Sequence, residues 1–582
     1  MKRLLLVGLV IVNISFSQNV VKLKTITLDV KANSTNGYYD KHNNYSYIDS
    51  EVLDAWVERE PHAVLNRVAG INAVNSGGVK TIFLNGFASN QTKILYRGVD
   101  LFDPSATQGA PYLDAFSMMN IERVEIIRGA ASSYYGNSAV AGVINLVPSV
   151  KTDTVFSVLA GDRYWADSVK TGFLGDWYRV GVSYSESKQN QLSWVDTDTE
   201  RDLEKKKSLE FDAEVRLGEK TNVSTFYSEN RVDSDLDGWN SHVLVNHELY
   251  GIKLDQELDK DSTLGLSYSG SNILRSYDAG SSLFQGYLNE LDVKFNEKFR
   301  NKDLVWGVTR RTEKAQTTWF AEKEQEDISF YNIMSVESLV NYSVGSRVTT
   351  YTNDNAVFTY NVSLWKKIAD YDVKLNYATG YRQPTLFEKY DSSSGDPNLD
   401  AEKSGIINVG LSYQGLDNAI LRTQIFSSTV KSKLAWVSDF PGAQTGKYMN
   451  VTSDTLIDGY SVGLDLLELP FVKKASTEYV YTNSRNDSGQ SLRCPKEKAT
   501  IDLLFDAFSC DLSIFYTKVA SRKDLGNVTL PAYQTVDVAL LKKIGNVDVF
   551  IKGINVFGED YQEIDGYNTL KKAWYFGFKT VL

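Results

Sequence analysis

The pattern that most constrains this chain is an alternation of apolar and polar residues with a period of two, which recurs from about Thr154 to the C-terminus. Between Phe358 and Leu364, large apolar residues occupy the even positions and small polar residues the odd ones. The same alternation marks residues 178–185, 264–269 and 407–413. Because successive side chains of a strand point to opposite faces, the pattern predicts many strands with one apolar and one wet face.

Two all-β architectures can accommodate strands with one apolar and one polar face. A soluble sandwich buries the apolar faces between two sheets, whereas a membrane barrel turns them to lipid and lines an aqueous lumen with the polar ones. A hydrophobic content of 42% and a mean hydropathy of −0.29 argue against a bundle of membrane-spanning helices. The 34 Tyr and 40 Gly beside only 10 Pro are typical of long strands and of an aromatic girdle. The alternation by itself leaves sandwich and barrel open.

The charge of the chain argues against a nucleic-acid partner, and the placement of its cysteines argues against a disulfide. Lys and Arg number 62 against 73 Asp and Glu, a net charge of −11, which argues against a nucleic-acid backbone as partner. The two cysteines, Cys494 and Cys510, flank expected strands that turn near Asp506. At about 3.3 Å per residue their sulfurs would lie about 30 Å apart, so we predict two free thiols.

The N-terminal residues 1–17 have the features of a secretory signal peptide. Two basic residues precede an apolar run from Leu4 to Val12, and Ser15 and Ser17 supply small residues before the expected cleavage site. The alternative, a membrane anchor, would need about 20 apolar residues. We therefore expect an exported protein without a transmembrane helix.

The rest of the chain divides into three parts that differ in composition and in residue pattern. Residues 18–47 form a polar tail, residues 48–150 a Gly-rich unit with short strands, and residues 151–582 the large β-unit. Within the second part, Asp49 to Asn66 has helical spacing of its apolar residues.

Three segments of the Gly-rich unit resemble the plug domain of TonB-dependent outer-membrane transporters. Residues 121–145 (IERVEIIRGAASSYYGNSAVAGVIN) are similar to the end of that plug, residues 64–72 (VLNRVAGIN) to its opening turn, and residues 86–100 to its central hairpin. The longest segment carries glycines that suit tight turns where strands cross: Gly129, Gly136 and Gly142.

The resemblance continues through the β-unit in residues 377–386 (YATGYRQPTL), 395–403 (GDPNLDAEK) and 553–561 (GINVFGEDY). It implies an all-β transmembrane fold, in which a 22-stranded antiparallel outer-membrane β-barrel holds the N-terminal plug in its lumen. Within the family the chain is most similar to the cobalamin transporter branch. Two positions depart from the family pattern, since Asn85 stands where an Arg usually precedes Gly, and Arg97 where an Asp does.

The family's mechanism implies several site residues. The tail segment that alternates best is the expected TonB box, which would pair with TonB as an added strand; a stretch of tail without function is the alternative. It comprises Lys24, Thr25, Ile26, Thr27, Leu28, Asp29 and Val30. The plug apices expected to contact substrate include Asn75, Ser76, Thr107, Gln108 and Tyr112. Arg123 and Arg128 are the expected polar contacts between plug and barrel, unless they are ordinary surface arginines of a strand.

Two acidic stretches are candidates for calcium in outer loops, as in cobalamin transporters. They contain Asp196, Asp198, Asp233, Asp235 and Asp237. The spacing from Asp233 onward opens like a calcium loop, but an EF-hand would need Glu at the twelfth position, where Leu244 stands. A solvated acidic loop without metal is the alternative.

The function that the resemblance implies is active import of a scarce nutrient complex, with a cobalamin-like corrinoid favoured. Its partners would be TonB with the inner-membrane energising complex, a small-molecule or metal-chelate substrate and, further, a surface lipoprotein. No enzymatic activity and no required cofactor are expected. Alternatives are a ferric siderophore or haem receptor, a sugar importer or, in a different class, a secreted calcium-binding all-β hydrolase or adhesin. Four scattered His make a catalytic triad harder to assemble.

Overall fold

The computed structural model describes residues 44–58, 60–76, 79–190, 193–237, 241–439, 445–507 and 509–582. Within these ranges no helix has both the length and the apolar character needed to cross a membrane. The expected signal peptide and the candidate TonB box both lie outside the described residues.

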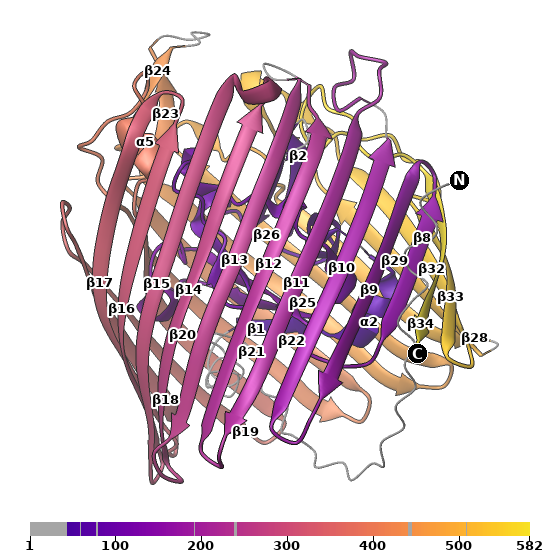
Figure 1. The fold of residues 1–582 in the computed structure, drawn as a ribbon, viewed down its shortest axis with the longest axis horizontal. Helices are drawn as coiled ribbons and strands as arrows, with labels where there is room; N and C mark the ends of the chain where they lie inside the picture. The colour runs from indigo at the N-terminus through magenta and orange to yellow at the C-terminus, as the bar shows by residue number, and fades with distance from the viewer. Residues whose placement is uncertain are drawn as a thin grey trace.

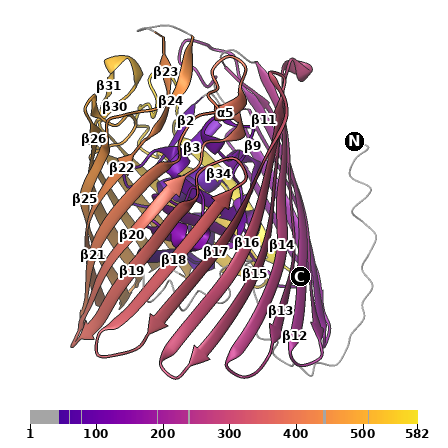
Figure 2. The same ribbon diagram turned by 90° about the vertical axis from the view of Figure 1, so that its left-hand side faces the viewer.

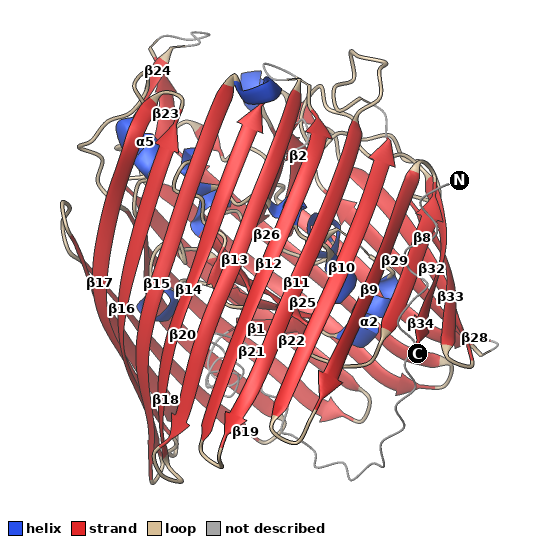
Figure 3. Ribbon diagram, in the orientation of Figure 1, coloured by secondary structure: helices blue, strands red, loops and turns tan. Residues whose placement is uncertain are grey.

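Twenty-two long strands, each antiparallel to its neighbours, close into a barrel (Figures 1 and 3). The last strand closes the barrel by pairing with the first, from Tyr575↔Gly161 to Val581↔Val155. A two-residue strand, β27 (Gly489–Gln490), extends β26 beside β28. The barrel strands are β8 (Val155–Gly161), β9 (Tyr164–Leu174), β10 (Tyr178–Asn190), β11 (Leu203–Leu217), β12 (Thr221–Asp235), β13 (His242–Glu257), β14 (Ser262–Tyr277), β15 (Ser282–Phe299), β16 (Lys302–Thr317), β17 (Phe320–Val336), β18 (Asn341–Tyr351), β19 (Val357–Ile368), β20 (Tyr371–Arg382), β21 (Glu402–Leu416), β22 (Ala419–Lys431), β25 (Thr455–Leu469), β26 (Val472–Asn486), β28 (Glu497–Ala507), β29 (Cys510–Val519), β32 (Tyr533–Ile544), β33 (Val547–Ile554) and β34 (Ala573–Val581).

The alternation in sequence maps directly onto the two faces of the wall. In β19, Phe358 is 60% exposed on the outside, while Thr359 is 2% exposed on the lumen side. A closed barrel has no second sheet against which to bury its outer face, so this apolar face is the one that contacts lipid. The sandwich alternative is therefore wrong, and the predicted barrel is confirmed.

The ends of the barrel differ. At one end short turns join the strands, for example at residues 218–220 and 545–546, and at the other end the connections are longer, such as those between β10 and β11 and between β33 and β34. In outer-membrane barrels the longer loops face outward and the short turns face the periplasm. The outer end also carries a 3-10 turn (Asp278–Gly280), α5 (Leu386–Tyr390), a second 3-10 turn (Leu525–Asn527) and two small hairpins, β23 (Leu434–Ser438) with β24 (Gly446–Asn450), and β30 (Arg522–Lys523) with β31 (Thr529–Leu530).

The N-terminal unit lies inside the lumen (Figure 2). Its main sheet has the order β1-β6-β7-β4-β5, and β2 and β3 form a separate hairpin. Its strands and α-helices are β1 (Asn44–Ile48), α2 (Ser50–Trp56), α3 (Pro61–Asn66), β2 (Ile71–Ser76), β3 (Val79–Leu84), β4 (Thr92–Tyr96), β5 (Val99–Asp100), β6 (Ile121–Arg128), α4 (Ser132–Tyr135) and β7 (Gly142–Pro148), and its 3-10 turns cover Ser89–Gln91, Thr107–Gly109, Leu113–Ala115 and Met118–Asn120. At Gly142 a Cβ would lie 2.0 Å from the carbonyl oxygen of Ile127, so only glycine allows β6 and β7 to approach this closely.

Two expectations for the start of this unit need correction. The helical stretch from Asp49 to Asn66 is two helices, because Val57 adopts a left-handed conformation (φ 52°) after α2 and Pro61 begins α3. Residues 44–47, assigned to the tail, belong to β1 of the plug sheet.

Plug and barrel share one hydrophobic core. Plug residues such as Ile71, Phe116 and Ile144 cluster with the wall residues Phe226 and Phe426. The two cysteines form no disulfide, as predicted; Cys494 is buried in an outer loop, and Cys510 begins β29.

Candidate functional site

Buried ion pairs connect the plug to the barrel wall, and the most enclosed of them centres on Arg97. Arg97 and Gly98 are the two central residues of the β4–β5 turn, with φ angles of 53° and 80°. The Arg97 guanidinium donates to Glu210 and lies 3.5 Å from Asp212, both on β11. Tyr96 also donates its hydroxyl to Glu210, at 2.9 Å.

Four further polar pairs connect other parts of the plug to the barrel wall. They are Arg311 to Asp100 at 2.6 Å, Arg67 to Asp537 at 3.0 Å, Lys552 to Glu58 at 2.6 Å and Gln91 to Glu402 at 2.8 Å. Of the two predicted contacts, Arg128 lies 3.9 Å from Glu478 of β26 and donates to Ser46 within the plug. Arg123 donates to Glu125 on its own strand at 2.7 Å.

A cluster of charged residues lies where the plug meets β11. Lys206 of the wall contacts Glu60 at 2.6 Å, and Lys80 contacts Asp114 at 2.7 Å within the plug. His62 lies 3.8 Å from Asp114. Burial, and then the charges of Lys80 and Lys206, hold the pKa of His62 well below its usual range, so this imidazole is neutral at pH 7.

Four of the five predicted substrate contacts lie in the outward-facing hairpin and loop of the plug, and Tyr112 does not. Asn75 and Ser76 end β2 at the tip of the β2–β3 hairpin. Thr107 is exposed and Gln108, at φ 62°, is half-buried in the loop between β5 and β6. Arg275 of β14 anchors this loop through an ion pair with Asp103 at 3.0 Å. Tyr112 is only 5% exposed and packs in the shared core beneath the loop.

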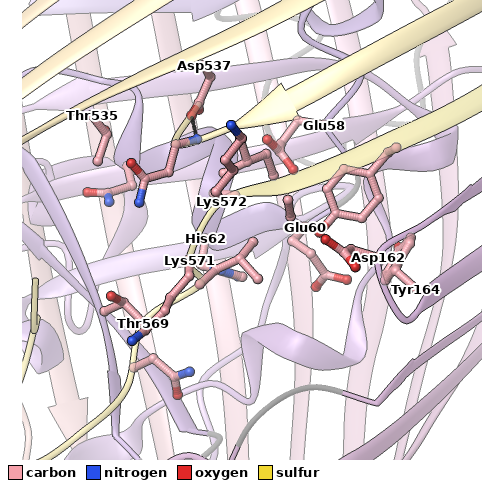
Figure 4. A pocket seen from close by; sticks show the side chains of 18 of the residues that line it. Glu58, Glu60, His62, Asp162, Tyr164, Thr535, Asp537, Thr569, Lys571 and Lys572 are labelled. Atoms are coloured by element: carbon pink, nitrogen blue, oxygen red, sulfur yellow. Dashed lines mark hydrogen bonds between the residues drawn. The ribbon is translucent and has the colours of Figure 1, made fainter. Parts of the chain in front are cut away.

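Beside these apices, a cavity of about 380 Å³ separates α3 from the wall formed by β8–β10 and β32–β34 (Figure 4). Its lining mixes charged, polar and aromatic side chains, among them Glu60, His62, Asn75, Tyr164 and Thr535. The floor includes Val57 and Glu58, at the end of α2. A space of this size and polarity suits water and small polar groups.

Two outer loops form the roof of this cavity and are joined to each other. Asn568 donates its backbone N–H to the carbonyl of Trp194 at 2.7 Å, and its amide group to the carbonyls of Ser193 and Val195 at 2.8 and 2.9 Å. Trp194 in turn covers the Lys80 ammonium of the plug at 5.8 Å. We call residues 193–202 and 555–572 together the roof loops.

Three carboxylates meet where one roof loop lies beside the residue Asp237, which follows β12. Asp198, Glu200 and Asp237 each offer an oxygen, and these oxygens lie within 4.8 Å of one another. Asp202, next to them, accepts from the backbone N–H of Trp194 at 2.7 Å, and its Oδ1 is buried without a hydrogen-bond partner. Burial, with Asp237 close by, raises the pKa of Asp202 to about 7. Carboxylate oxygens in this number are a donor set that suits Ca²⁺.

The structure separates the five predicted metal ligands. Asp233 and Asp235 lie within β12 rather than in a loop, and strand geometry spaces them along the wall. Asp233 contacts Lys205 at 3.2 Å and His242 at 2.8 Å, and Asp235 accepts from the backbone N–H of Leu203. Asp196 accepts from Gln562 of the roof loops. Only Asp198 and Asp237 converge, and Glu200, which the sequence reasoning missed, joins them.

Sequence reasoning also missed Arg97 as the main plug contact, although a signal was present. Arg in place of the usual Asp before Gly98 puts a long cation where the backbone has a positive φ. An unusual residue at such a position is a reason to look for a buried partner. Nothing in the sequence pattern indicated that residues 555–572 cover the cavity.

Comparison with known families covers nearly the whole chain. The family model described as TonB-dependent Receptor Plug Domain matches residues 39–143, and the one described as TonB dependent receptor-like, beta-barrel matches residues 142–556. The vitamin B12 transporter BtuB of Photobacterium profundum is 23% identical over an alignment of 568 residues, which covers 91% of each chain. BtuB of Vibrio cholerae is 22% identical over an alignment of 564 residues, which covers 88% of each chain.

Solved structures share the fold at still lower identity. The siderophore receptor PirA of Acinetobacter baumannii superposes with a TM-score of 0.80 at 14% identity, over 94% of this chain and 99% of that one. The copper transporter OprC gives a TM-score of 0.80 at 13% identity, over 92% and 98%. These two proteins share one architecture but are named for different cargoes, a siderophore and copper.

Proposed function

Because this chain belongs to the TonB-dependent receptor family of the outer membrane, we propose that it imports a scarce nutrient complex with energy drawn from TonB. The observation that carries the proposal is the plug, which occupies the lumen and shares its core with the wall. Passage then requires the plug to rearrange, and an outer membrane offers neither a nucleotide pool nor a membrane potential to drive that change. Members of the family are transporters and receptors, so a secreted hydrolase or adhesin is not favoured.

For the energy input we propose that residues 24–30 bind TonB as an added strand. Their alternation and their place in a polar tail ahead of the plug support this assignment. Deleting residues 24–30 should abolish binding of the isolated C-terminal domain of TonB and leave cargo binding unchanged. Unaltered TonB binding would contradict the assignment.

For the cargo we favour a cobalamin-like corrinoid, with a ferric siderophore or haem as the alternative. Two relatives that align along about nine-tenths of the chain are vitamin B12 transporters, whereas structural neighbours include a siderophore receptor. A corrinoid would outsize the cavity of about 380 Å³, so we place its contacts above the plug, on Asn75, Ser76, Thr107 and Gln108. Tyr112 would support these contacts from beneath.

The test is direct binding and uptake with cyanocobalamin, cobinamide, ferric catecholate and haemin. We expect corrinoids to bind and the other ligands to fail at equal concentration. Thr107→Arg should weaken corrinoid binding at least tenfold, because it places a long cation at an exposed apex. Thr352→Arg, a matched change in another exposed outer loop, should leave it unchanged. Binding of ferric catecholate or haemin in place of corrinoid would transfer the proposal to that cargo.

We also propose that Asp198, Glu200 and Asp237 hold Ca²⁺, with Asp202 beside them. Binding would fix the segment that carries Trp194 over the plug. Calorimetric titration should show Ca²⁺ affinity at least tenfold lower for Asp198→Asn with Asp237→Asn. The paired control, Asp233→Asn with Asp235→Asn, alters the other predicted carboxylates and should have no effect. Equal losses from both pairs would reject this location.

A surface lipoprotein remains a proposed partner at the outer end. The β23–β24 hairpin projects there (Figure 1) and exposes Trp436, Val437 and Met449. Co-purification of such a lipoprotein from native membranes, and its loss when these three residues become Ser, would support the pairing.

A further inference from the structure

The charged cluster where the plug meets β11 holds more carboxylates than cations. Lys206 of the wall lies 2.6 Å from Glu60 and 2.9 Å from Glu204. Lys206 also lies 3.8 Å from Asp114, which Lys80 contacts at 2.7 Å. Three carboxylates thus share two ammonium groups, and the cluster has a net negative charge when all of these groups are ionised. A negative excess in a buried place favours the binding of a cation.

Two polar atoms of this cluster are buried and have no hydrogen-bond partner among the described residues. They are Oε2 of Glu204 and Nδ1 of His62. Glu204 is only 2% exposed, so little water reaches its carboxylate. Nδ1 of His62 lies 3.8 Å from Oδ1 of Asp114, which is beyond hydrogen-bond distance. Because buried polar atoms are nearly always paired, two unpaired ones beside a negative excess point to a cationic ligand.

Three side chains of the plug bring donor atoms of two kinds together. One oxygen of Glu60, one oxygen of Asp114 and one ring nitrogen of His62 all lie within 4.8 Å of one another. Glu60 is the N-cap of α3, His62 lies in the first turn of that helix, and Asp114 belongs to the 3-10 turn Leu113–Ala115, which packs against α3. Ligand atoms on one tetrahedral ion are about 3.4 Å apart, so small side-chain rotations would let these three atoms converge.

The donor set distinguishes this place from the calcium candidate at the roof loops. That candidate offers carboxylate oxygens only, whereas here an imidazole nitrogen joins two carboxylates. The imidazole of His62 is neutral at pH 7, which is the form that binds metals. Imidazole suits Zn²⁺, Cu²⁺ and Ni²⁺, while Ca²⁺ takes oxygen ligands. Glu60 and His62 both line the cavity, so water can supply a remaining ligand (Figure 4).

The two lysines would keep partners beside a bound ion. Lys206 retains Glu204 at 2.9 Å when Glu60 turns to the ion, and the second oxygen of Asp114 can serve Lys80. The competitor at low pH is the proton, since burial raises the pKa of Glu60 and of Asp114. Binding of a metal should therefore release protons and weaken as the pH falls.

We propose that Glu60, His62 and Asp114 bind a divalent transition-metal ion of the Zn²⁺ class, beneath the roof loops and beside the cavity. The ion would tie the start of α3 to the Leu113–Ala115 turn, within the plug. The site is separate from the cargo contacts and from the calcium candidate, so it does not depend on the proposed function.

Calorimetric titration with Zn²⁺ tests the site in the full-length, tag-free protein after removal of metals, with Ca²⁺ in excess throughout. We expect one Zn²⁺ per chain, and affinity at least tenfold lower for His62→Gln. The matched control is His242→Gln, because His242 also lies beside a carboxylate, Asp233, at 2.8 Å. This control should bind Zn²⁺ as the native protein does. Equal affinities of the native protein and His62→Gln, or equal losses from the two variants, would overturn the proposal.

Pulsed EPR with Cu²⁺ as the probe reports the ligands directly and does not depend on a change in affinity. The native protein should show the coupling of one imidazole nitrogen, and His62→Gln should show none. Asp114→Asn should keep the nitrogen coupling and lower the affinity, which a variant that fails to fold would not do. An imidazole coupling that persists in His62→Gln would place the metal on another histidine and overturn the proposal.

The pH dependence of Zn²⁺ affinity supplies a third measurement on the native protein alone. Between pH 7 and pH 5 the affinity should fall at least fivefold, as protons compete for Glu60 and Asp114. Titrations in two buffers of different ionisation enthalpy should show protons released on binding. An affinity that stays constant over this range, without proton release, would contradict coordination by these buried carboxylates.

Discussion

At the scale of single residues, Arg97 explains how a strained position is retained. A long side chain at φ 53° is unusual, and strain of this kind persists where the surroundings determine it. Here the surroundings are two buried carboxylates of the wall: Glu210, and Asp212, which also pairs with Arg179 of β10. Glu210 also accepts from Tyr96, so the turn, the ion pair and the tyrosine fix one seating of the plug.

The Arg97→Asn variant should loosen the plug in its seat. Asn tolerates the backbone conformation, so the change removes the ion pair and leaves the turn intact. Leaving Glu210 buried without its cation should cost about 3–5 kcal/mol, while Asp212 keeps its ion pair with Arg179. Limited proteolysis should then cleave the plug at least tenfold faster. Adding Glu210→Gln should recover part of the loss, and no recovery would mean that backbone strain, not the ion pair, governs seating.

The raised pKa of Asp202 predicts that the stability of the roof loops depends on pH. Its pKa is about 7 in the folded loop, against about 3.8 for an ordinary Asp, because burial and then Asp237 disfavour its charge. The ordered loop therefore holds a proton that the disordered loop releases. Its stability is greatest below about pH 4, falls as the pH rises, and loses this contribution above pH 7.

Hydrogen exchange of residues 193–202, corrected for intrinsic rates, should accordingly be slower at pH 5 than at pH 8 without metal. Ca²⁺ at pH 8 should restore the protection, since it would neutralise the same carboxylates. Asp202→Asn should remove the difference between the two pH values, and Asp400→Asn, in another exposed outer loop, should preserve it. A difference that survives Asp202→Asn would assign the effect to another group.

At the scale of elements, the two roof loops are joined to each other by hydrogen bonds from two amide side chains, Asn568 and Gln562, and between their backbones. Asn568 joins the two loops, and an isolated bridge pairs Val195 with Tyr567. Connecting loops open at lower free energy than the paired strands of a wall, as segments that admit a ligand must. The roof is therefore the element expected to move when cargo enters.

The Asn568→Ala variant should separate the roof loops. It removes two hydrogen bonds of about 1 kcal/mol each, so exchange at Trp194 and Val195 should speed up several-fold and cargo should dissociate faster. Asn301→Ala is the matched control, because its amide joins two turns at the opposite end by donating to the carbonyl of Glu337. Equal effects of the two variants on cargo release would exclude a specific role for the roof.

The elements were predictable to different degrees. The alternation of apolar and polar residues located strands such as β19, because one face of each strand contacts lipid and the other contacts water. The break between α2 and α3 was visible as Pro61, but the apolar spacing continued across it. Asp233 and Asp235 resembled a loop because carboxylates at alternate positions mark both calcium loops and the outer ends of long strands. The convergence of Asp198 with Asp237 depends on how two loops meet, and such contacts leave no local pattern.

At the scale of the whole molecule, the distribution of charged residues follows from the position of the plug inside the barrel. The outer face of the wall is apolar for lipid, and the lumen face carries carboxylates and cations that pair with the plug, such as Arg311 with Asp100. Strand pairing closes the wall independently of the plug, since β34 pairs directly with β8. The wall can therefore persist without the plug, while the plug, with its core shared between both parts, depends on the wall.

Removing the plug should thus convert the protein from a closed receptor into a pore. A variant that lacks residues 44–150 retains every barrel strand, and water can solvate the lumen charges that lose their partners. In planar bilayers we expect it to conduct ions steadily, while the full chain stays closed, and we expect its barrel to unfold at a lower temperature because the shared core is lost. Arg97→Asn, which keeps the plug but weakens its seat, should give only brief openings. A folded but non-conducting barrel would show that the outer loops, rather than the plug, close the lumen.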